Sequence, residues 1–239
     1  MQDLLRPVVI VGALGYFVDI YDMTLFLNVR EQSLRDIGLD RLVKGGEWYE
    51  DLMSWQMTGM IIGGVVFGVF GDRLGRLTTL FGSILIYSIA NIANSFVYTF
   101  WPYAIWRFIA GFGLSGELGG CISLVSETLS KERRGYGTAM VTTIGIFGAV
   151  VGGIMAEVVS WRANYQIGGG MGLALLLMRI GVSESGMYES AKLADSNSHS
   201  GSIARGNFFA LFTERMRLVK YLRCIFIALP TWYMIGILV

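Results

Sequence analysis

Long apolar segments alternate with shorter polar segments along this chain. Seven of the apolar segments meet or approach the roughly 20 residues that a helix needs to cross the hydrocarbon core of a bilayer. They are residues 7–29, 53–71, 77–98, 101–128, 136–159, 162–182 and 221–239. The pattern predicts an all-α membrane protein with six transmembrane helices and part of a seventh.

The polar connections divide the chain into three parts. Short turns join the first six segments, except for a polar first loop with the sequence VREQSLRDIGLDRLVKGGEWYED. We predict a six-helix transmembrane domain over 1–182, a cytoplasmic linker with an amphipathic helix over 183–220, and the start of a second transmembrane half over 221–239. This is the pattern expected of a doubled protein that is cut early in its second half.

The composition agrees with a membrane protein. Hydrophobic residues make up 54% of the 239 residues and charged residues 15%, whereas an ordinary soluble domain has about 25% charged residues. A net charge of +1 argues against a nucleic-acid partner. The sequence shows no nucleotide-binding loop, nucleophile motif or metal-ligand cluster, so we expect no enzyme activity, no cofactor and no metal.

The distribution of basic residues predicts the orientation, because cytoplasmic connections are richer in Lys and Arg than external ones. With a cytoplasmic N-terminus, the inner connections before the linker contain Arg73, Arg76, Lys131, Arg133 and Arg134. The second outer connection has no charge and the third has only Arg162. We therefore expect the N-terminus inside.

One inner connection, GVFGDRLGR, has a compact charged motif. Its residues Gly68, Asp72, Arg73, Gly75 and Arg76 follow the pattern Gly-x-x-x-Asp-Arg-x-Gly-Arg. This pattern resembles the most characteristic motif of the major facilitator superfamily, which lies between the second and third helices. The resemblance implies an N-terminal six-helix bundle built as a 3+3 inverted repeat, with the second half supplied by the same chain or another.

Two further stretches support the resemblance. RFIAGFGLSGELGG followed by SETLSKERRG is similar to the fourth helix of the metabolite:proton symporter branch, and ESGMYES is similar to a segment after helix six of related branches. ESGMYES has Gly186 where proline is usual, and helix five has Ala149 where the antiporter-associated pattern has proline. GYFVDIYDMTLF looks more like phosphate:proton or sialate-type branches than like standard metabolite symporters. The resemblance implies a transporter of the bacterial inner (plasma) membrane and leaves the substrate open.

Four charged residues lie well inside predicted spans, namely Asp19, Asp22, Arg107 and Glu117. Each costs about 2.5–3.5 kcal/mol near a helix centre on insertion scales, so we expect them to face one another or water. Asp19 and Asp22 share a helix face with Gly15 and Phe26. Asp22 and Arg107 lie at similar depths in antiparallel helices, so an ion pair between them is geometrically possible.

These charges suggest a substrate and proton site. Arg107 is expected to attract an anion, and Asp19, Asp22 and Glu117 to handle a proton. The glycines around Glu117 leave room for its carboxylate, and an arginine neighbour gained or lost during alternating access would let it release or bind a proton. The alternative is a static ion pair that fixes helix packing.

The motif at Asp72 has two interpretations. In the family it acts as a cytoplasmic latch, here with Glu127 and Arg134 as local partners or parallel members, whereas a plain positive-inside anchor explains only the arginines. The predicted function is secondary active transport of a small anionic metabolite coupled to protons. The alternatives are a phosphate, sugar or efflux carrier, or a receptor that kept the fold without transporting.

Overall fold

The computed structural model describes residues 7–38, 47–129, 133–179, 216 and 218–226. The side chains of Arg76, of residues 121–128 and of a few other helical residues also lie outside this description. The predicted linker and seventh helix are therefore described only at 216 and 218–226, where the backbone is helical and the side chains are mostly exposed.

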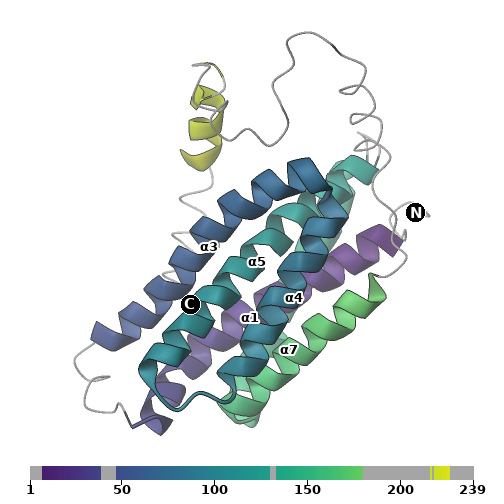
Figure 1. Ribbon diagram of the computed structural model, residues 1–239. Helices are drawn as coiled ribbons and strands as arrows, with labels where there is room; N and C mark the ends of the chain where they lie inside the picture. Colours follow the sequence, from purple (N-terminus) through teal and green to yellow (C-terminus); the bar gives the residue numbers. More distant parts are fainter. Residues whose placement is uncertain (1–6, 39–46, 130–132, 180–215, 217, 227–239) are drawn as a thin grey trace.

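Six long helices form an antiparallel bundle, drawn in Figure 1. They are α1 (Pro7–Asp36), α3 (Glu47–Leu74), α4 (Arg76–Asn94), α5 (Phe100–Thr128), α6 (Arg134–Val158) and α7 (Trp161–Met178). One end of the bundle carries the start of α1 and the α3–α4 turn. The opposite end carries the end of α1 and the connection between α4 and α5.

The packing of the helices has the symmetry of an inverted repeat. α1 packs mainly along α6, and α3 packs mainly along α5. α4 packs against α5 and α7, and α1 also contacts α7. If α1, α3 and α4 exchange places with α5, α6 and α7 in that order, the α1–α6 contact becomes the α3–α5 contact and the α4–α5 contact becomes the α1–α7 contact. This symmetry agrees with the predicted all-α 3+3 bundle.

Small residues allow the closest of these approaches, as in many membrane helix pairs. A Cβ on Gly148 of α6 would collide with the carbonyl oxygen of Phe17 in α1. Similarly, a Cβ on Gly59 of α3 would collide with the carbonyl oxygen of Phe108 in α5. Glycine is therefore required at these two positions to hold the helices at this distance.

The predicted first loop is too long. Its first part continues α1 as far as Asp36, and its last part begins α3 at Glu47. The continuation of α1 is stabilised because Val29 and Leu34 are buried in the same core as Trp161, whose Nε1 donates a hydrogen bond to Asp36 at 2.7 Å. Apolar positions spaced along this polar stretch thus extend the helix beyond the predicted span.

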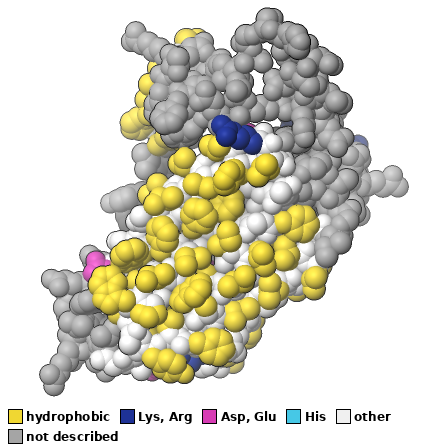
Figure 2. Space-filling view, viewed as in Figure 1, with side chains coloured by type: hydrophobic (Ala, Val, Ile, Leu, Met, Phe, Trp, Pro, Cys, Tyr) yellow, Lys and Arg dark blue, Asp and Glu magenta, His cyan; other side chains and the backbone are white. Residues whose placement is uncertain are grey.

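Within the described part of the chain, three stretches are long and apolar enough to cross a membrane by length and composition alone, namely Val9–Asp36, Asp51–Leu74 and Arg134–Val158. The other three helices, α4, α5 and α7, carry buried polar side chains such as Asn91, Glu117 and Asn164. The face shown in Figure 2 is nevertheless largely hydrophobic, with charged side chains near its ends. On this face the outward side chains are thus mostly apolar, while the buried polar and charged side chains lie inside the bundle.

Candidate functional site

The charged side chains buried among the described residues are Asp19, Asp22, Arg107, Glu117 and Arg179. They come from α1, α5 and the residue that follows α7. If all five are ionised, three acids face two arginines and the set has a net charge of −1. The bundle therefore holds one more acid than base in this buried group.

Arg107 of α5 forms the first part of this group with Asp22 of α1. The Nη2 atom of Arg107 lies 3.8 Å from the Oδ2 atom of Asp22, and both side chains are almost fully buried. Asn91 of α4 joins them, because its Nδ2 donates to Asp22 Oδ1 at 2.7 Å while its Oδ1 accepts from Arg107. With its amide oxygen turned toward the guanidinium, Asn94 also accepts from Arg107 Nε at 2.9 Å. Three helices thus hold the Asp22–Arg107 pair, which the sequence analysis considered geometrically possible.

Aromatic rings surround the guanidinium of Arg107. Its Cζ atom lies 4.8 Å from the ring centre of Phe26 and 4.7 Å from that of Tyr165, both within the range of cation–π attraction. The hydroxyl of Tyr165 is 2.8 Å from that of Tyr103, which is 2.9 Å from Ser33 Oγ. The Nη1 group of Arg107 is buried without a hydrogen-bond partner among the described residues.

Glu117 and Arg179 form the second part. Arg179 donates from Nη1 to Glu117 Oε2 at 3.0 Å and from Nη2 to Oε1, so the contact is bidentate. A Cβ on Gly15 of α1 would collide with the Glu117 carboxylate, which shows that the pair lies directly against the backbone of α1. The arginine that contacts Glu117 is therefore Arg179, which the sequence analysis did not name.

Asp19 lies between these two parts of the group. Its side chain is 3% exposed, and neither carboxylate oxygen has a hydrogen-bond partner among the described residues. It is close enough to Glu117, Arg179 and Asp22 for their charges to act on it. The four residues expected from the sequence are thus brought together, and Asp19 is the acid whose charge is least committed to a partner.

Sequence reasoning missed Arg179. The only signal was a single basic residue within the apolar run MGLALLLMRIGV, inside the predicted sixth span. A lone arginine near a span end commonly sets topology or reaches the membrane surface, so this position alone did not point to a buried partner. Asn91 was missed for a similar reason, because its role depends on Asp22 and Arg107 in other helices.

The predicted gating motif lies at the end of the bundle that carries the start of α1 (Figure 1). α3 ends at Leu74, and Gly75 turns the chain into α4 with φ +103°, a conformation that favours glycine. Asp72 is half-buried and Arg73 is exposed. The side chains of Arg76 and Glu127 lie outside the described part of the chain.

Arg134 begins α6, and its Nε donates to the carbonyl oxygen of Leu129 at 3.1 Å. Its expected relation to the motif stays a prediction. Gly68, the first residue of the motif, is not a close-packing position, because nothing lies within 4 Å of a Cβ added there.

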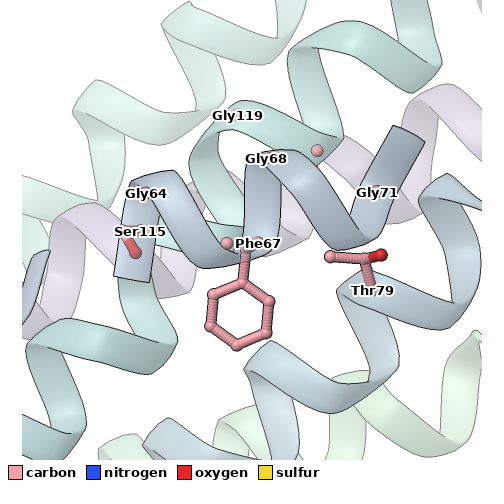
Figure 3. A pocket seen from close by; sticks show the side chains of 9 residues that line it. Gly64, Phe67, Gly68, Gly71, Thr79, Ser115 and Gly119 are labelled. Atoms are coloured by element: carbon pink, nitrogen blue, oxygen red, sulfur yellow. The ribbon is translucent and has the colours of Figure 1, made fainter. Parts of the chain in front are cut away.

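A small hollow of about 170 Å³ adjoins the motif (Figure 3). It lies between α3, α4 and α5 and is lined mostly by glycines, together with Phe67, Thr79 and Ser115. None of the buried charged residues lines it. Among the residues that the structure describes, no group of three or more His, Cys, Asp or Glu side chains is placed to hold a metal ion.

The comparisons with known proteins agree with this architecture. The chain is 25% identical to a gentisate transporter of Corynebacterium glutamicum, with 95% of this chain and 52% of that protein aligned. It is 26% identical to a gallate transporter of Pseudomonas putida, over 82% of this chain and 44% of that protein. The chain thus spans about half or less of these relatives, which are named as transporters and not as enzymes.

A solved structure shows the same fold. The proton:xylose symporter XylE bound to 6-bromo-6-deoxy-D-glucose matches 78% of this chain and 46% of that chain, with a TM-score of 0.69 and 18% identity. The sequence model described as Major Facilitator Superfamily matches residues 12–239, nearly the whole chain. The chain therefore belongs to the Major Facilitator Superfamily of integral membrane proteins.

Proposed function

We propose that the intact protein is a secondary active transporter that moves a small anionic metabolite by alternating access and couples this movement to protons. The observation that carries the proposal is the buried group of three acids and two arginines inside a bundle with an apolar outer face. Ionisable groups are costly within a membrane, and they mark pathways of substrates, ions or protons. In this proposal the second transmembrane half, in the same chain or another, completes a site near the midplane.

The substrate we propose is an aromatic carboxylate, with Arg107 as the group that attracts it. Gentisate and gallate, named for two relatives, are both aromatic carboxylates. At 3.8 Å the contact between Arg107 and Asp22 is longer than a direct hydrogen bond, so Asp22 does not saturate the guanidinium. The unpartnered Nη1 group offers a further donor for a carboxylate. The rings of Phe26 and Tyr165 add apolar surface of the kind that an aromatic ring can stack on.

We propose that the acids of this group carry the coupled proton. Asp22 accepts a hydrogen bond from Asn91, and Glu117 is held by Arg179, whereas Asp19 has no such partner. An acid without a committed partner can change its protonation state without breaking a strong contact. Asp19 is therefore the first candidate, with Asp22 and Glu117 responding to its charge.

We also propose the orientation and the role of the α3–α4 turn. The N-terminus is placed in the cytoplasm of a bacterial cell, so the turn at Gly75 lies on the inner side. There, Asp72 and Arg73 act as a latch that holds the inner side closed against the second half. The single-residue turn supports this role, because it leaves α3 and α4 directly connected at the motif.

The test uses the intact protein as its gene encodes it, reconstituted into lipid vesicles, with radiolabelled gentisate as the probe acid. We expect the probe acid to accumulate inside when the outside is made acidic, and accumulation to disappear when a protonophore collapses the gradient. Vesicles without protein are the control for passive entry of the protonated acid.

The alternative functions give different outcomes. Binding of the probe acid without any movement would support a receptor and contradict transport. Equilibration that ignores the proton gradient would contradict proton coupling. Accumulation of labelled phosphate or xylose in place of gentisate, under the same gradient, would contradict the proposed substrate class.

A further inference from the structure

We propose that Arg179 is a positioning residue that neutralises Glu117 and thereby leaves Asp19 as the single proton-accepting carboxyl of this cluster. The inference deepens the proposed function and rests on it. It concerns how many protons the cluster takes up and which side chain takes them. Arg179 can have this role because it contacts Glu117 directly and, as an arginine, does not itself release a proton.

The contact between Arg179 and Glu117 commits the whole carboxylate. Both terminal nitrogens of the guanidinium donate to the two carboxylate oxygens, which is the fork geometry of strong arginine–carboxylate pairs. Arg179 is 2% exposed and Glu117 is fully buried, so bulk water does not weaken the pair. In the proposal, this contact keeps Glu117 ionised for as long as Arg179 stays in place.

Among the described residues, the charged or titratable groups that interact electrostatically with Asp19 come from several elements. These are Glu117 from α5, Arg179 after α7, Tyr87 from α4 and Asp22 from α1 itself. α6 meets this stretch of α1 with glycine, as Gly148 does at Phe17. Arg179 donates to both oxygens of Glu117, and although its charge also acts on Asp19, neither carboxylate oxygen of Asp19 accepts a hydrogen bond among the described residues.

Charge counting gives the consequence. Asp19, Glu117 and Arg179 together have a net charge of −1 when both acids are ionised, and they become neutral when one proton binds. The Asp22–Arg107 pair is neutral by itself. One proton on Asp19 therefore removes the uncompensated charge from the interior, and a second proton would have to displace Arg179 from Glu117.

A purely structural arginine would behave differently. If Arg179 only fastened the end of α7 to α5, its replacement would change stability but not the number of protonated carboxyl groups. The measurement must therefore count protonated carboxyls. Infrared difference spectroscopy does this, because the C=O stretch of a protonated carboxyl is separate from the bands of a carboxylate.

The experiment compares spectra of the intact protein in lipid vesicles between mildly alkaline and mildly acidic buffer. We expect one buried carboxyl signal in the parent and its loss in Asp19→Asn. Arg179→Gln should gain a second signal, since Glu117 is then no longer neutralised, whereas Arg179→Lys should keep one. Arg162→Gln is the matched control, because Arg162 contacts backbone carbonyls and rings at the other end of α7. It should keep the parental signal.

A double variant covers the case in which Arg179→Gln does not fold. Glu117→Gln with Arg179→Gln removes both charges and keeps both volumes, and it should retain the single Asp19 signal. Loss of the signal in this double variant would assign the proton to Glu117 and overturn the inference. So would a parental signal that survives Asp19→Asn, or a folded Arg179→Gln protein with the same single signal as the parent.

Transport is scored separately on the same vesicles. If the infrared pattern is as expected but the probe acid does not accumulate, the proposed function fails and the role of Arg179 stands. If the probe acid accumulates but the pattern differs, the proposed function stands and the role of Arg179 is overturned.

Discussion

Replacing Gly15 with alanine perturbs the centre of the charged group by one methyl group. The new Cβ would collide with Oε1 of Glu117 and press against Nη2 of Arg179, which are the flexible ends of both side chains. The helices can therefore stay in place while the ion pair moves. Overpacking in a buried site costs about 1–3 kcal/mol, and the better helix propensity of alanine returns about 0.5–1 kcal/mol. We expect a net loss in unfolding free energy of up to about 2.5 kcal/mol.

The matched control is Gly153→Ala in α6, where nothing lies within 4 Å of an added Cβ. This variant should gain about 0.5–1 kcal/mol from helix propensity alone. The assay is unfolding of the detergent-solubilised protein, followed by proton-driven accumulation of the probe acid in vesicles. We expect Gly15→Ala to reduce accumulation of the probe acid by more than its loss in unfolding free energy explains. Equal stability and equal accumulation in the two variants would show that the pair does not lie against α1 as described.

Three further predictions concern single positions. Gly75→Ala should destabilise the protein by about 1–3 kcal/mol, because alanine is strained at φ +103°. Gly82→Ala, at an open position within a helix, should cause no loss of stability when both variants are compared by thermal unfolding. Asp22→Asn should lower the free energy of unfolding by about 3–5 kcal/mol, because it leaves Arg107 buried without a counter-charge. The control Glu31→Gln, which breaks an exposed ion pair on α1, should lower it by no more than about 0.5 kcal/mol. Asp72→Asn should shift the protein toward its inward-open state. A loss of about 1.4 kcal/mol of latch contacts changes the ratio of the inward-open to the inward-closed state tenfold. Labelling of cysteines introduced on the inner side, in a background lacking the exposed Cys224, should then speed up, and unchanged rates on both sides would reduce the motif to an anchor.

The sequence was sufficient to predict what depends on local spacing and on length. Apolar segments predicted the helices, and the three-residue spacing of Asp19 and Asp22 placed both acids on one face. The depth of Arg107 in an antiparallel helix made its pairing with Asp22 geometrically possible, and the structure places the two side chains 3.8 Å apart. The glycine of the α3–α4 turn was recognised from the motif, and its positive φ gives the physical reason for it.

The rest depends on which helices become neighbours. Arg179 pairs with Glu117 only because the end of α7 lies near the middle of α5, and no local pattern contains that information. The same holds for Asn91, which is one polar residue in an apolar run until the bundle places it between Asp22 and Arg107. The length of α1 was underestimated because its last turns are stabilised by the core around Trp161 and not by lipid.

Proton movement caused by substrate is the most direct test of the central claim that this buried group couples transport to protons. The measurement follows the external pH of lightly buffered vesicles containing the intact protein when the neutralised salt of the probe acid is added outside. The account predicts a rise in external pH, because protons enter with the acid, and predicts that Asp19→Asn abolishes the rise while the protein stays folded. Uptake of the probe acid without any pH change, or a rise of the same size in Asp19→Asn, would contradict the account.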